Sequence, residues 1–155
     1  MVSDIRLLII VNSNQRVIVV NSHSGSTVAK VTLNSNPCRV CMFNNIMAAV
    51  TLRDTSLQFI NINDDSIELG RSFSLEGEVC AVARSEDKIV VSFVPHHWLQ
   101  VLSIDGTVMH TFNTRTAGED VFKRLSLIAA SADGMFYVSD GGTSTITQLG
   151  SNLYS

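Results

Sequence analysis

Two adjacent histidines, His96 and His97, stand directly before the only tryptophan of the chain, Trp98. Imidazoles bind metals and act as general bases, so this trio could open a metal site or a catalytic pocket. Neighbouring residues of an extended chain point to opposite sides, however, and no histidine lies nearby at a His-x-His or His-x3-His spacing. The sequence therefore predicts an exposed turn opened by Pro95, with the tryptophan packing between neighbouring sheets and no metal.

A second candidate for metal chemistry is the pair Cys38 and Cys41 in "CRVC". A zinc site of two such pairs needs four thiolates, but only Cys80 remains. Residues three apart in a strand also face opposite ways, so the two thiols diverge. We therefore expect core cysteines, and their odd, low number favours a reducing, cytoplasmic setting.

Catalytic motifs give no better support. The chain has neither a Gly-x-Ser-x-Gly nucleophile motif nor a phosphate-binding glycine loop. The acidic pairs Asp64–Asp65 and Glu86–Asp87 fall in polar segments typical of solvated hairpin tips. The sequence predicts no enzyme activity and no cofactor.

Composition limits the class of protein. The chain has 155 residues, of which 45% are hydrophobic and 16% charged, which is typical of a globular protein. A net charge of −3 gives no general attraction to nucleic acid or to anionic membranes. No apolar run approaches the ~18 residues of a membrane helix. We expect one domain over residues 1–155 that does not associate with membranes.

The elements that position these residues form a repeat. Short runs rich in Val, Ile, Thr and Phe alternate with turns rich in Asn, Asp, Gly and Ser, which predicts strands and no long helix. Four copies of one pattern occur, each with a strand, a polar turn, a second strand and another turn. Their first strands align on Val11, Val50, Val91 and Val138. Their second strands align on Val17, Leu57, Leu99 and Ile146.

Further strands flank these copies, giving four strands per period of ~40 residues, the pattern of β-propeller blades. "CRVCMF", "VCAVAR" and "SLIAAS" precede three of the copies and suit a crowded innermost strand. The predicted fold is therefore all-β, with about four blades at residues 5–33, 38–75, 79–112 and 125–155. A β-sandwich is the structural alternative.

The expected strands number three, four, four and three in successive blades. Even a four-bladed ring of four-stranded blades would need sixteen strands, and a six-bladed ring twenty-four, so with fourteen expected strands we expect an incomplete ring. Its two open sheet edges, at Ile5 to Val11 and at the "FYVSD" blade, invite pairing with another chain. Self-association through these edges is the consequence.

The segments "NPCRVCMFNNIMAAVTLRDTSLQFI" and "EVCAVARSEDKIVVSF" resemble blades of NHL-type propellers of TRIM-like (tripartite motif) proteins, especially their expanded invertebrate group. The resemblance covers residues 5–149 and is most specific over "TVMHTFNTRTAGEDVFKRLSLIAASADGMFYVSDGGTSTITQL". Asp140, Thr143 and Ile146 keep part of the Asp-x-x-Asn-x-x-Ile-x-Val blade motif, whereas Val11 stands where the first blade should have Asp. The resemblance implies a protein- or RNA-binding module attached to a ubiquitin-ligase front end. The zinc-binding residues of such a front end do not occur in this chain.

In such blades the turns between second and third strands, and the links to each following blade, share one face. The longest of these loops, Asn113 to Arg124, is expected there, and long loops often carry binding. We therefore expect a protein partner to bind this face. The candidate contact residues are Arg53, His96, His97, Arg115, Lys123 and Arg124.

Two other functions stay open. RNA binding through Lys123 and Arg124 is possible in principle, but the expected face carries five basic residues against six acidic ones. A propeller hydrolase of the lactonase type would hold calcium between converging acids. The strands expected to line the centre, "CRVCMF", "VCAVAR" and "SLIAAS", carry none.

Overall fold

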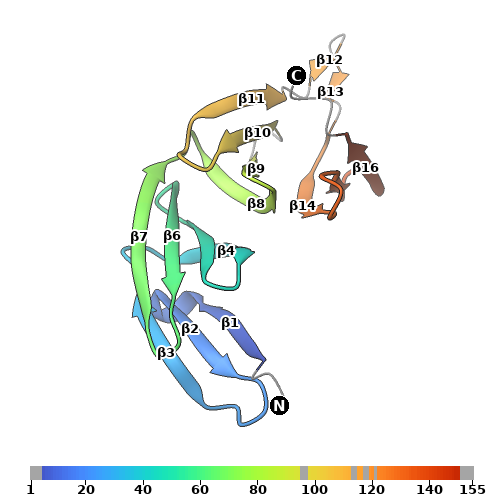
Figure 1. The fold of residues 1–155 in the computed structure, drawn as a ribbon. Helices are drawn as coiled ribbons and strands as arrows, with labels where there is room; N and C mark the ends of the chain where they lie inside the picture. Colours follow the sequence, from blue (N-terminus) through green and yellow to red (C-terminus); the bar gives the residue numbers. More distant parts are fainter. Residues whose placement is uncertain (1–4, 95–97, 113–114, 117–118, 121, 151–155) are drawn as a thin grey trace. The chain divides into compact units, whose positions relative to one another are not determined.

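The computed structural model describes residues 5–94, 98–112, 115–116, 119–120 and 122–150 (Figure 1). The chain divides into two compact units, Met1–Leu75 and Glu76–Ser155. All the regular elements described are strands except one short 3-10 helix, Asn12–Asn14. The predicted all-β class is confirmed.

The first unit contains two antiparallel sheets. One has three strands in the order β1-β2-β3: β1 Arg6–Val11, β2 Arg16–Asn21 and β3 Thr27–Thr32. The other has four in the order β4-β5-β6-β7: β4 Pro37–Asn44, β5 Met47–Leu52, β6 Ser56–Ile62 and β7 Ile67–Ser74.

The second unit contains three antiparallel sheets. The four-stranded sheet comprises β8 Glu78–Ser85, β9 Lys88–Val94, β10 Trp98–Ser103 and β11 Val108–Phe112. The three-stranded sheet comprises β14 Leu125–Ala130, β15 Phe136–Asp140 and β16 Thr145–Leu149. A two-stranded ladder, β12 Arg115–Thr116 with β13 Glu119–Asp120, interrupts the segment that the sequence predicts to be one long loop.

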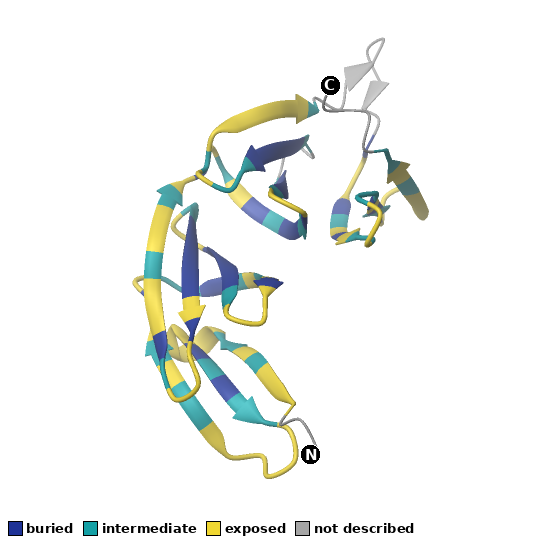
Figure 2. Cartoon of the chain, viewed as in Figure 1, coloured by how far each residue is buried: buried dark blue, intermediate teal, exposed yellow. Residues whose placement is uncertain are grey.

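The strand sequences account for where the cores lie. The middle strands β5 and β9 are almost continuous apolar runs, as expected of strands covered on both faces, and nearly all their residues are buried. The outer strands β7 and β11 are more polar and largely exposed (Figure 2). Each unit thereby has its own apolar core, which includes Val50 and Ile60 in the first and Val90 and Phe136 in the second.

Three strands begin their sheets at one edge and carry the small apolar sequences noted above. We call β4, β8 and β14 the leading strands. Each has a register shift near its start, between Pro37 and Arg39 in β4, Val79 and Ala81 in β8, and Leu125 and Leu127 in β14. These shifts are β-bulges, which bend a strand at a fixed point.

A hydroxyl residue of the next strand stands opposite each bulge. The Thr51 Oγ1 accepts a hydrogen bond from the Arg39 N–H at 3.1 Å. The Ser139 Oγ accepts one from the Leu127 N–H at 3.0 Å. Ser92 occupies the same place in the third sheet but is fully buried with no hydrogen-bond partner for its hydroxyl. Two bulges are thus stabilised by a hydroxyl, whereas the third leaves one unused.

Candidate interaction surface

In the first unit, the loops at one end of the sheets meet through backbone hydrogen bonds. The Arg53 N–H donates to the Asn36 carbonyl at 2.9 Å, and the Leu75 N–H donates to the Thr55 carbonyl at 2.7 Å. The turn between the second and third strands therefore holds the links before and after its sheet, as the sequence predicts. The Arg53 side chain is exposed at this end.

The corresponding end of the second unit holds Lys123 and Arg124. The Gly141 N–H donates to the Arg124 carbonyl at 2.9 Å, which repeats the Arg53–Asn36 contact of the first unit. Both basic residues are exposed and lie immediately before the leading strand β14. Their backbone is therefore tied to the sheet, while the two residues remain exposed.

Asp140 adds a further tie. One carboxylate oxygen accepts the Lys123 N–H at 2.7 Å, and the other accepts the N–H groups of Arg124 and Gly142, each at 2.8 Å. The corresponding residue of the second sheet is Leu52, which has no such group. Because a carboxylate bound by several backbone N–H groups fixes their positions, Asp140 presents Lys123 and Arg124 on a rigid backbone.

The charge of Asp140 is stabilised by the same contacts. Burial on its own raises the pKa of this side chain, which is only 2% exposed. The hydrogen bonds from the backbone of Lys123, Arg124 and Gly142, and from the side chain of Thr143, outweigh burial and lower the pKa to about 2. Asp140 is therefore ionised throughout the physiological range.

Gly141 and Gly142 allow the turn between β15 and β16 to lie close to Lys123 and Arg124. A Cβ atom on Gly142 would lie 2.6 Å from the Lys123 Cβ and 3.2 Å from the Arg124 N. A Cβ atom on Gly141 would lie 3.0 Å from a guanidinium nitrogen of Arg124. The sequence Asp140-Gly141-Gly142 thus provides both the acceptor and the space that the Lys123–Arg124 backbone needs.

The remaining candidate residues are placed only in part. His96 and His97 lie outside the described residues. Arg115 belongs to β12, where it pairs with Asp120 of β13. Arg53 lies in the first unit and the other candidates in the second, so a single face containing all of them stays a prediction.

Trp98 begins β10, directly after the two histidines. Its ring stacks on Phe93 of the neighbouring strand, with ring centroids 4.3 Å apart, and it is half-buried. The ring therefore packs against a neighbour of its own sheet, because the two residues are opposite one another in the β9–β10 register.

The cysteines are not core residues. Cys38, Cys41 and Cys80 form no disulfide among the described residues and are only half-buried, because they lie on leading strands at a sheet edge. The Cys80 thiol donates to the Leu125 carbonyl at 3.2 Å, joining two leading strands of the second unit. Among the described residues, no group of three or more His, Cys, Asp or Glu side chains could hold a metal ion. No described helix is long and apolar enough to cross a membrane.

The sequence interpretation missed the role of Asp140. The sequence interpretation counted Asp140 among the six acidic residues of the expected loop face. In the structure, its carboxylate instead accepts hydrogen bonds from the backbone N–H groups of Lys123 and Arg124. The signal was present in the chain: an Asp at the end of a strand, followed by two glycines and preceded by a loop ending in Lys-Arg.

No protein-family model matches this sequence, and no curated protein sequence matches it. Solved structures do match. A propeller domain of Cps50 (Swd1) from Myceliophteria thermophila matches with a TM-score of 0.75 and 12% identity, over 92% of this chain and 46% of that one. A functionally unknown protein from Desulfotomaculum acetoxidans DSM 771 matches with a TM-score of 0.74 and 12% identity, over 91% of this chain and 45% of that one.

A third match is BBS1N, crystallised in complex with ARL6DN, with a TM-score of 0.68 and 13% identity. It covers 88% of this chain and 40% of BBS1N. This chain thus spans less than half the length of these three solved chains. At such low identity the likeness concerns the fold alone, and it confirms the predicted fold class: the chain is built from β-propeller blades.

Proposed function

We propose that this chain is a non-catalytic protein-interaction module, and that its Lys123–Arg124 segment binds an acidic surface of a protein partner. The observation that carries the proposal is the tie between Asp140 and this segment. A binding group on a rigid backbone loses less conformational entropy when a partner binds. Exposed cations held in this way are suited to recognition of carboxylates.

The comparisons support a protein partner in general terms. BBS1N, whose propeller fold this chain shares, was crystallised in a complex with another protein. Propeller loops commonly bind partners because a rigid scaffold holds them in place. The partner of this chain is inferred from its own charged segment and not from that complex.

A charge reversal tests the proposal. Lys123→Glu should reduce the amount of partner captured from cell extract about tenfold, as expected for a charge contact at an interface. Lys30→Glu is the matched control, because Lys30 is exposed on β3 and changes the net charge equally. Equal capture by both variants and the unaltered protein would refute a role for this segment.

The finer assignment rests on the sequence resemblance. We propose that the module is the substrate-recognition part of a TRIM-like ubiquitin ligase of the cytoplasm. The captured partner should then be a protein that carries ubiquitin in cells, and Lys123→Glu should lose it from the captured material whereas Lys30→Glu keeps it. Capture of a partner that carries no ubiquitin would contradict the ligase assignment and be compatible with the interaction module.

RNA binding is the alternative that the adjacent cations Lys123 and Arg124 favour. Phosphate contacts release counterions, so retention on an RNA column would fall steeply with salt concentration. The interaction proposal predicts that ribonuclease treatment leaves capture of the protein partner unchanged. Loss of capture after that treatment would support RNA instead.

Self-association is proposed for one sheet edge. Among the described residues β16 pairs only with β15, and its Ile146 side chain is 73% exposed. An exposed strand edge with an apolar side chain pairs readily with another chain. We assign the expected self-association to this edge.

A further inference from the structure

The first unit contains a groove beside β1 that the Lys123–Arg124 proposal does not use. Its volume is about 820 Å³. It is lined from both sheets of this unit, by the start of β1, the middle of β4 and the turns that follow β4 and β6. Its apolar lining includes Leu8, Val40, Met42 and Ile46.

β1 is apolar like the buried middle strands, but it is poorly covered. Leu7 is 49% exposed and Ile9 is 40% exposed, whereas Ala48 to Leu52 of β5 are all buried. Met42 and Ile46 across the groove are 44% and 64% exposed. The groove therefore leaves apolar groups of both sheets in contact with water.

The backbone of β1 has unused hydrogen-bonding groups along the same groove. Among the described residues β1 pairs only with β2, and the Ser22 N–H donates to the Ile5 carbonyl. In an antiparallel ladder alternate residues bond to the partner strand, so the N–H and C=O groups of Arg6, Leu8 and Ile10 point to the other edge. This edge can accept another strand.

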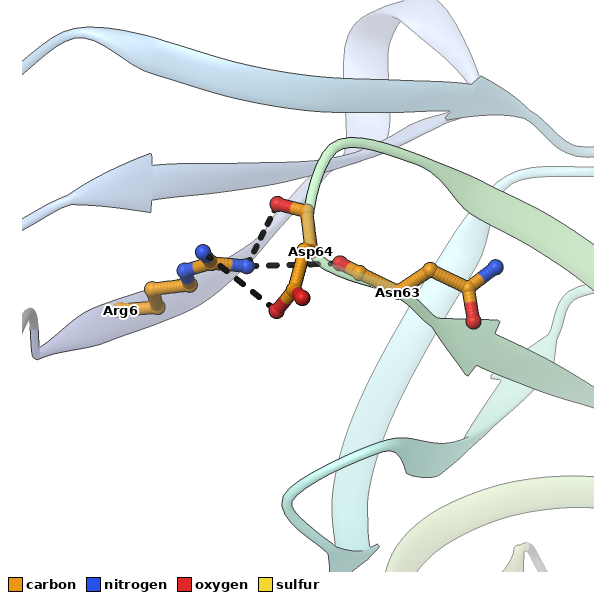
Figure 3. Close-up of polar contacts among 3 residues, drawn as sticks. All are labelled: Arg6, Asn63 and Asp64. Carbon is orange, nitrogen blue, oxygen red and sulfur yellow. Dashed lines mark hydrogen bonds and ion pairs between the residues drawn. The ribbon is translucent and has the colours of Figure 1, made fainter.

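One end of the groove is fixed by Arg6. Its guanidinium donates to the carbonyls of Asn63 and Asp64, at 3.3 Å and 2.6 Å, and lies 3.9 Å from the Asp64 carboxylate (Figure 3). These contacts join the start of β1 to the turn between β6 and β7. The groove therefore has a defined width at this end without any added strand.

The second unit shows what occupies the corresponding place. There the leading strands β8 and β14 of two neighbouring sheets lie against one another, joined by the Cys80–Leu125 hydrogen bond. Ala81, Leu125 and Ile128 share one apolar core. Among the described residues of the first unit, the four-stranded sheet has a leading strand, β4, and the three-stranded sheet begins at β1. The groove lies beside β1, where a leading strand of that sheet would pack.

We propose that this groove binds an extended segment of another protein, which adds to β1 as an antiparallel strand and lays small apolar side chains against β4. A second copy of this chain is a poorer occupant. Its strands of this type, β4, β8 and β14, are already paired within their own sheets. Strand addition of this kind draws affinity from the backbone and specificity from alternate side chains.

A peptide with the sequence of β8, Glu78–Ser85, carrying Cys80→Ser and a fluorescent label, is a direct probe. Binding is measured by fluorescence anisotropy on the whole chain. Met42→Lys places a charge in the apolar groove and should weaken binding about tenfold or more, because the charge must be desolvated. Met109→Lys is the matched control, since Met109 is 48% exposed on β11.

Ile46→Lys provides a second groove variant should Met42→Lys fail to fold. Amide hydrogen exchange gives an independent readout: the peptide should slow exchange at Arg6, Leu8 and Ile10 more than at Leu7 and Ile9. Absence of peptide binding, or equal loss in the Met109→Lys control, would overturn the proposal. A dimer detected by light scattering and abolished by Met42→Lys would overturn it in favour of a second copy.

Discussion

Asp140 shows how one carboxyl group can organise a surface without contacting a ligand. Its oxygens accept three backbone N–H groups, two of them from Lys123 and Arg124. Its pKa is lowered to about 2, so it carries its charge wherever these contacts are needed. The basic residues that we propose as the contact are therefore positioned by an acid.

Asp140→Asn should destabilise the chain at neutral pH, because an amide has one acceptor oxygen where the carboxylate has two. The lowered pKa corresponds to at most about 3 kcal/mol of stability. This contribution is complete above the unfolded-state pKa of about 3.9 and is lost as pH falls toward about 2. Urea denaturation should show the full difference between variant and parent at pH 7 and only a small part of it at pH 2, where about half of the Asp140 side chains are protonated. A difference that persists unchanged at pH 2 would contradict this account.

The three hydroxyl residues opposite the bulges make a second residue-scale comparison. Ser139→Ala should cost about 1 kcal/mol, because it leaves the Leu127 N–H without its acceptor. Ser92→Ala should be neutral or stabilising, because the buried Ser92 hydroxyl has no partner to lose. Thermal denaturation of both variants checks the pair, and equal losses would show that Ser92 has a hydrogen bond.

At the scale of elements, the strands were largely predictable because apolar alternation and turn chemistry repeat. Val50 and Val91, aligned in the sequence, both lie buried in the second strands of their sheets. The bulges could not be predicted, since they depend on pairing across strands. Turn conformations were also missed: Gln15, Thr55 and Ser144 adopt positive φ where glycine is the usual signal.

The candidate site was predictable as a list of charged residues but not as an arrangement. Lys123 and Arg124 stand out in the sequence, whereas their tie to Asp140 joins residues 16 or 17 positions apart. The groove beside β1 was equally hidden, because it arises from packing between two sheets. Burial of the cysteines was overestimated, since sheet edges shield side chains less than sheet centres do.

Gly142→Ala tests the packing of the β15–β16 turn against the basic segment. The added methyl group would meet the Lys123 Cβ at 2.6 Å, so the segment must move. We expect a loss of about 1–3 kcal/mol, the usual cost of overpacking. Gly150→Ala is the control, since its nearest neighbour would lie 3.8 Å away. Equal stability of the two variants in urea denaturation would contradict close packing at Gly142.

Trp98→Ala tests the stack between β9 and β10. Replacing a fully buried tryptophan by alanine lowers the free energy of unfolding by about 3–5 kcal/mol. Because Trp98 is half-buried against Phe93, we expect a smaller loss. Thermal denaturation of the variant measures this cost. A loss within the full range would mean that the ring is more deeply enclosed than the structure shows.

At the scale of the whole molecule, the chain presents two open edges among its described strands, at β1 and at β16. We assign β1 to a strand from another protein and β16 to self-association. The number of blades in a complete ring stays a prediction, and six follows from the resemblance. Ile146→Lys should convert oligomers to monomers in light scattering, because a charge at an exposed edge opposes strand pairing. An unchanged oligomer would exclude this edge.

The most direct measurement of the central claim is amide hydrogen exchange of the chain with and without its captured protein partner. The account predicts slower exchange at residues 122–126 and 140–144, where the Asp140-bound basic segment meets the partner. Protection confined to other parts of the chain, with these two segments unchanged, would contradict it.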